Sequence, residues 1–201
     1  MTAAALVGIT GGLIAGPFIA EAQQAGDLET EDASADGAEQ SSTTPSFAYD
    51  DVIRAFDLAA EYDEVSRIHI SGTTAQLHVP ISSGTTYDIV AVDQAGRVST
   101  GPGGTYGEGV PDARFDPSAI DPEEIAAMVV RAPDVYAETT GNDGNTASTL
   151  NMGAPGSGTE YAGVKTGSPV VRVLLDLGDY GDGGGTVTWT PDGERVVEVR
   201  E

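Results

Sequence analysis

The chain has only two histidines, His69 and His78, and both lie in one predicted β-hairpin. Its register makes them diagonal neighbours on one face, close enough for the two imidazoles to share a metal ion with a carboxylate such as Asp88 of the next strand. A metal-dependent hydrolase is therefore one hypothesis, although Arg67 between the imidazoles would repel a cation. The alternative is a solvent-facing binding surface made of Arg67, His69, Gln76 and His78, without a metal or other cofactor.

The hairpin itself follows from two apolar-alternating runs. Residues 65–71 and 74–81 flank Gly72-Thr73, a Gly-first pair that suits a two-residue turn. Pairing across this turn sets Ile68 opposite Leu77 on the face away from the histidines. Both runs independently give this register, which therefore predicts a buried apolar face and a polar outer face.

Composition excludes several functions. Acids outnumber bases by 32 to 9, for a formal charge of −23, and such a surface repels nucleic acids and anionic membranes. With no cysteine there is no disulfide framework, thiolate metal site or Cys nucleophile. The glycine-rich stretches 101–109 and 153–158 lack a phosphate-binding spacing and are expected to be loops. Asp179 and Asp182 lie in a third glycine-rich stretch, which lacks the EF-hand spacing and is expected to be a hairpin loop.

The N-terminal part predicts a position outside the cytoplasmic membrane. Residues 1–20 carry no charge and form a hydrophobic signal or membrane anchor, although the usual leading Lys or Arg is missing. A buried core helix is the alternative for this segment. Residues 21–46 are acidic and almost without large apolar side chains, which predicts a disordered linker. The folded domain then spans 47–201.

The folded domain begins with an amphipathic helix at about 47–62, capped by Ser46. After the first hairpin, strands at 85–92 and 97–100 complete a first unit, residues 47–100. A second helix starts at Asp121-Pro122 and is expected to end at Pro133. Residues 134–160 are expected to form a long, disordered loop in which Leu150 and Met152 could dock on a partner.

The remaining strands are expected at 161–166, 169–177, 186–190 and 195–200. Gly167-Ser168 would turn the first pair into a hairpin with Val164 opposite Val171 and Ala162 opposite Val173. The second unit, residues 116–201, thus repeats the order of the first. The sequence predicts an α+β fold of two tandem α-β-β-β-β units, with two helices on one face of an antiparallel sheet and Ile68, Leu77, Val171 and Val173 in its core.

Two turns carry a resemblance to known proteins. Asp93-Gln94-Ala95-Gly96-Arg97-Val98 and Pro191-Asp192-Gly193-Glu194-Arg195-Val196 are similar to the strand endings of PepSY-like modules, and the tandem layout resembles that of the β-lactamase inhibitor protein. The order of uncharged segment, acidic linker and repeat resembles uncharacterised, membrane-tethered actinobacterial proteins. These resemblances imply an extracytoplasmic location, and none of them supplies a catalytic residue.

Together these observations favour a non-enzymatic, extracytoplasmic interaction module, membrane-tethered or secreted. Its partner would be a protein or cell-envelope component engaged by the outer sheet face. Contact with the membrane would come through the N-terminal segment alone. The sequence leaves the oligomeric state open.

Overall fold

This computed structural model describes residues 45, 47–82, 84–106, 114–142, 146–155, 160–165, 167–176 and 184–201. The predicted segment 1–20, nearly all of the predicted linker 21–46, and the stretch with Asp179 and Asp182 lie outside these residues. None of the helices described is long and apolar enough to cross a bilayer.

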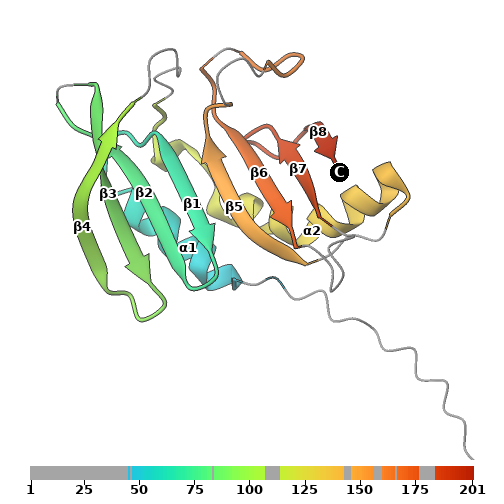
Figure 1. Cartoon of the computed structure of the whole chain (residues 1–201), viewed down its shortest axis with the longest axis horizontal. Coiled ribbons are helices and arrows are strands. Elements are labelled where there is room, and N and C mark those ends of the chain that lie inside the picture. Colours follow the sequence, from blue (N-terminus) through green and yellow to red (C-terminus); the bar gives the residue numbers. More distant parts are fainter. Residues whose placement is uncertain are drawn as a thin grey trace, which may run out of the picture. The chain divides into compact units, whose positions relative to one another are not determined.

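The elements occur twice in the same order (Figure 1). The first unit contains α1 (Tyr49–Ala59), β1 (Arg67–Ser71), β2 (Thr74–Pro80), β3 (Thr86–Asp93) and β4 (Val98–Thr105). A short 3-10 helix, η1 (Pro117–Ala119), leads to the second unit, which contains α2 (Pro122–Thr140), β5 (Ala147–Gly153), β6 (Val170–Leu175), β7 (Gly185–Trp189) and β8 (Val196–Arg200). The predicted tandem α-β-β-β-β arrangement is confirmed.

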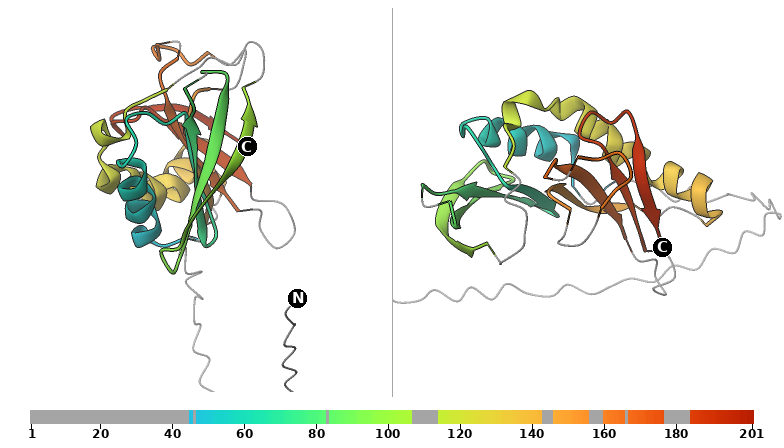
Figure 2. Two further views of the ribbon diagram at one scale, coloured as in Figure 1. Left: turned by 90° about the vertical axis from the view of Figure 1, so that its left-hand side faces the viewer. Right: turned by 90° about the horizontal axis from the view of Figure 1, so that it is seen from above.

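All eight strands form one antiparallel sheet in the order β4-β3-β2-β1-β5-β6-β7-β8. The two units join edge to edge, because β1 pairs with β5. Both helices lie on the same side of the sheet (Figure 2). Ile68, Leu77, Val171 and Val173 are fully buried beneath them, so the predicted α+β class and its core are confirmed.

The first hairpin has the register that the sequence predicts. Ser71 pairs with Thr74, Ile68 with Leu77, and His78 with Arg67. The turn depends on Gly72, whose φ of 53° lies in the left-handed region that a side chain disfavours.

Helix α1 begins later than predicted. Its N-cap is Ala48 instead of Ser46, and a side chain from inside the helix takes over the capping. The Asp51 carboxylate accepts hydrogen bonds from the Ala48 backbone N–H at 2.8 Å and from Arg54 Nη1 at 2.6 Å. Although Asp51 is buried, both bonds stabilise its charge near the positive end of the helix dipole.

Helix α2 starts where the sequence predicts but continues past Pro133. The Asp121 carboxylate accepts the Glu123 backbone N–H at 2.9 Å, as an N-cap does. The helix then runs to Thr140 and ends at Gly141, whose φ is 77°. An interior proline costs about 3 kcal/mol. Pro133 is buried, so the packing of its ring offsets part of that cost.

The expected loop at 134–160 is wrong at its start and in its central part. Residues 134–140 belong to α2, and 147–153 form β5, which lies in the middle of the sheet. Leu150 and Met152 are fully buried in the core and are therefore not free to dock on a partner. The polar composition of this segment suggested a loop, but it comes from Thr149 and Asn151, which alternate with Leu150 and Met152 along the strand and point to the other face of the sheet.

The expected hairpin between 161–166 and 169–177 is also wrong. Residues 161–165 form no strand, and β6 pairs with β5 instead. Val171 therefore lies opposite Met152, and Val173 opposite Leu150.

Strand β4 is longer than the predicted 97–100, because it continues through Gly101, Pro102, Gly103 and Gly104. An edge strand tolerates proline, since one side of it needs no ladder hydrogen bond. The glycine-rich stretch expected to be a loop is thus partly a strand.

Candidate functional site

The face of the sheet opposite α1 and α2, called here the open face, carries a row of polar residues across both units. The register places Gln76, His69, Asn151, Arg172 and Thr188 side by side on β2, β1, β5, β6 and β7. None of the helices or strands that the structure describes lies over this face (Figure 2). The predicted binding residues Arg67, His69, Gln76 and His78 all belong to the open face.

His69 is held by a residue from the second unit. Its Nδ1 lies 2.7 Å from Asn151 Oδ1. Because a carbonyl oxygen only accepts, Nδ1 carries the proton, and the Asn151 amide nitrogen remains available as a donor. The two residues are 82 positions apart in the chain, and no local sequence signal pairs them.

His78 belongs to an aromatic cluster instead of a metal site. Its ring stacks on Tyr87 at a centroid distance of 4.3 Å and an interplanar angle of 11°. Tyr87 in turn contacts Tyr106 at 4.9 Å, and the Tyr106 hydroxyl lies 2.6 Å from Ser66 Oγ. We call His78, Tyr87 and Tyr106 the aromatic cluster. Neither tyrosine was identified from the sequence.

The environment of His78 disfavours its protonated form. Burial against the cluster is the main cause that lowers the pKa of His78 from an ordinary value of 6.5 to about 4, and the charges of Arg67 and His69 contribute to the same shift. The predicted surface is therefore not fully solvent-facing at His78, because a stacked ring loses part of the water that would solvate its charge.

This shift predicts a pH dependence of folding. The pKa of His78 is lower in the folded state than in the unfolded state, so the unfolded chain binds a proton more readily. The free energy of unfolding is therefore highest above pH 6.5 and decreases as the pH falls toward 4. After allowance for solvent screening of the half-buried ring, we expect a loss of about 1 kcal/mol by pH 5. Urea unfolding of the wild type and His78→Phe between pH 7.5 and 5 measures this. An identical pH slope in both proteins would contradict it.

The residues proposed for a metal-dependent hydrolase do not converge. Asp88 pairs with Val79, which packs against the core, so Asp88 lies on the helix-covered face while both histidines lie on the open face. Within the described ranges, no group of three or more His, Cys, Asp or Glu side chains could hold a metal ion.

A pocket of about 230 Å³ opens on the open face beside His69. It is lined by Arg67, Asn151, Met152, Gly153 and Arg172, which the β1-β5-β6 order brings together. Sequence reasoning missed Asn151 and Arg172, because the strand that joins them to β1 was expected to be a loop.

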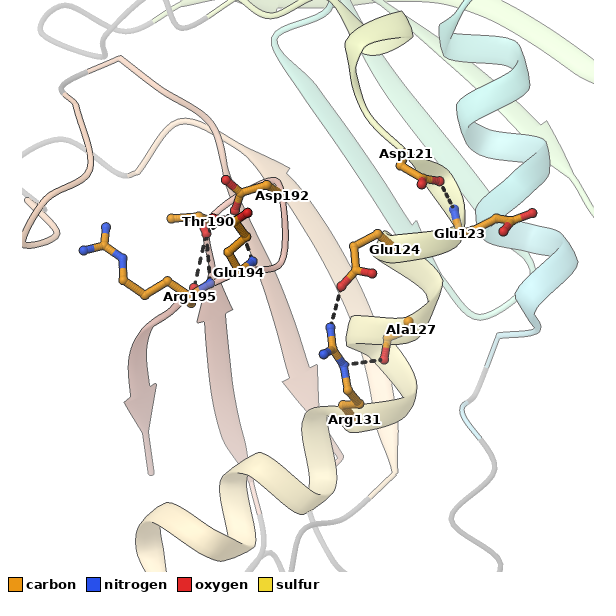
Figure 3. Close-up of polar contacts among 9 residues, drawn as sticks. All are labelled: Asp121, Glu123, Glu124, Ala127, Arg131, Thr190, Asp192, Glu194 and Arg195. Carbon is orange, nitrogen blue, oxygen red and sulfur yellow. Dashed lines mark hydrogen bonds and ion pairs between the residues drawn. The ribbon is translucent and has the colours of Figure 1, made fainter.

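A second, acidic pocket of about 480 Å³ lies where the start of α2 faces the β7–β8 turn (Figure 3). Its carboxylates already have partners within the protein. Asp121 caps α2, Glu124 Oε1 lies 2.6 Å from Arg131 Nη2, and Asp192 accepts from Thr190 Oγ1 at 2.6 Å. The bond from Thr190, with another from the Glu194 N–H, lowers the pKa of Asp192. These carboxylates therefore support local structure.

Comparison with known proteins gives little further information. No family model and no curated protein sequence matches the chain. The fold is similar to a crystal structure described as a "putative lipoprotein" from Clostridium difficile 630, with a TM-score of 0.46 and 9% identity over 81% of this chain and 95% of that one. A likeness at this level supports no argument about function. No family match supports the resemblances to PepSY-like modules and to the β-lactamase inhibitor protein.

Proposed function

We propose that this chain is a non-enzymatic interaction module that acts outside the cytoplasmic membrane, either tethered by residues 1–20 or secreted. It binds a protein or cell-envelope component through the open face. The observation that carries this proposal is the face itself: partly exposed polar residues, Gln76, His69, Asn151 and Arg172, continue across both units of one sheet, and none of the described helices or strands covers this face.

Two features support a role in binding. The side chains of the open face are held in place before any partner arrives, because His69 is bonded to Asn151 and His78 is stacked on Tyr87. Such preorganisation lowers the entropy cost of association.

The alternative, a metal-dependent hydrolase, needs His69, His78 and Asp88 as its metal ligands. Asp88 lies on the other face of the sheet from both histidines, so these three side chains do not form a metal site.

The proposal is tested by site-specific photo-crosslinking in cells that produce the full chain. A photoreactive residue at Gln76, on β2 of the open face, should give a discrete adduct whose mass identifies the partner. The matched control is Val130 on α2, which is 67% exposed and should give none. Equal adducts at both positions, or none from Gln76, would contradict an open-face binding site.

Fractionation of the same cells tests the location. We expect the chain in the membrane fraction or the culture fluid, and the mass of the mature N-terminus distinguishes a retained anchor from a removed signal. A chain confined to the cytosol would contradict the proposed location.

A further inference from the structure

Arg67 and Arg172 on the open face lack the carboxylate partners that five of the other six arginines have. Ion pairs to carboxylates hold Arg54, Arg97, Arg114, Arg131 and Arg200. Within the described part of the chain, no carboxylate faces Arg67 or Arg172, although acids outnumber bases by 32 to 9. Both arginines line the 230 Å³ pocket, and none of the described Asp or Glu residues does.

The surroundings of Arg172 leave polar atoms without partners. Its Nη2 donates to the Ala154 carbonyl at 3.1 Å, which holds the guanidinium in place, whereas its buried Nε has no acceptor among the described residues. The neighbouring Thr188, opposite Arg172 in the register, is fully buried, and its hydroxyl has no partner in the part of the chain that the structure describes. Buried donors without partners are costly, most of all on a charged group. An anion beside Arg172 would provide the missing acceptor.

The rest of the pocket also suits an anion. Asn151 accepts from His69 through Oδ1, which leaves its amide N–H groups to donate. Gly153 contributes no side chain, and a Cβ there would approach the Ser66 carbonyl oxygen to 2.9 Å. The nearest acid along the polar row, Glu198 opposite Thr188, is paired with Arg200 at 2.7 Å.

We propose that the pocket between Arg67, Asn151 and Arg172 binds a carboxylate group. This inference rests on the proposed function, because it specifies what the partner of the open face presents: an acidic side chain or a chain terminus. The planar guanidinium fork matches a carboxylate. A carboxylate also carries only one charge, so the field of a chain with net charge −23 repels it less than a doubly charged phosphate. At 230 Å³ the pocket is below the ~300–1,000 Å³ of sites for whole drug-sized ligands, and so it accommodates a single group.

Titration of the full chain with acetate, followed by backbone amide NMR at constant ionic strength, tests the site. Shifts should concentrate at Arg67, Asn151, Gly153 and Arg172 and saturate. Arg172→Gln should weaken binding by about tenfold or more, since it removes a charge-assisted hydrogen bond. Arg67→Gln provides an independent test, because that side chain is exposed and its loss leaves the fold intact. Arg195→Gln, the same charge change at an exposed site outside the pocket, is the control and should leave binding within about twofold.

Three results would overturn the inference: no saturable shifts, equal weakening by Arg195→Gln, or tighter binding of inorganic phosphate than of acetate at the same sites. These titrations use purified protein, so their failure leaves the crosslinking result untouched. Loss of the Gln76 adduct with intact acetate binding would instead count against the proposed function alone.

Discussion

Leu150→Ala should lower the free energy of unfolding by about 2–5 kcal/mol, the range for removing a buried leucine side chain. Leu150 is fully buried on β5, which is paired on both sides, with β1 and β6. Because β5 joins the two units, the loss should affect both of them together. Urea unfolding followed by fluorescence of Trp189, the only tryptophan, and by far-UV circular dichroism should give coincident transitions, both at lower urea.

Leu174→Ala is the matched control, since it makes the same deletion on the adjacent strand. Leu174 pairs with Thr149 on the open face and is only partly buried, so its loss should cost about 1 kcal/mol or less. A small effect of Leu150→Ala, comparable with that of Leu174→Ala, would mean that residues 147–153 are a loop after all.

Gly103→Ala should destabilise the domain by about 1–3 kcal/mol, as overpacking does. A Cβ at this position would lie 2.5 Å from two ring carbons of Tyr87 and 2.7 Å from its carbonyl oxygen. Either the ring or the edge strand β4 must therefore move. A displaced Tyr87 would uncover His78, whose pKa should rise from about 4 toward 6.5. NMR titration of the imidazole measures this change.

Gly101→Ala is the control for this experiment, because a Cβ there would meet no atom within 4 Å. It places the same substitution on the same strand and should leave both stability and the pKa of His78 nearly unchanged. If Gly103→Ala and Gly101→Ala behaved alike, the aromatic cluster would not be packed as described.

The first unit could be predicted because its signals are local. Gly72 marks a tight turn, and the flanking strands alternate strong apolar and polar side chains, so the register followed from residues a few positions apart. The two helix starts differ in this respect. Asp121 precedes its helix as a typical cap, whereas α1 is capped from within by Asp51, and Ser46 was a plausible but wrong choice.

The second unit and the site depend on contacts that no local pattern encodes. Strand β5 is stabilised by its position between β1 and β6, which compensates for the weak strand propensity of a segment rich in Ser, Thr, Asn and Gly. Without β5, the sequence could not bring Asn151 to His69 or Arg172 near Arg67. Pro133 likewise shows that tertiary packing can override a helix-breaking residue.

The pairing of β1 with β5 has a consequence for symmetry. Two copies of one α-β unit related by a twofold axis between these strands would form the same sheet as a homodimer, with the residue on the axis facing its own copy. In the single chain the centre of this pairing holds two different residues, His69 and Asn151. Joining the units covalently thus allows an asymmetric donor–acceptor pair at the axis and places the basic pocket on one side of it only, which a symmetric dimer could not do.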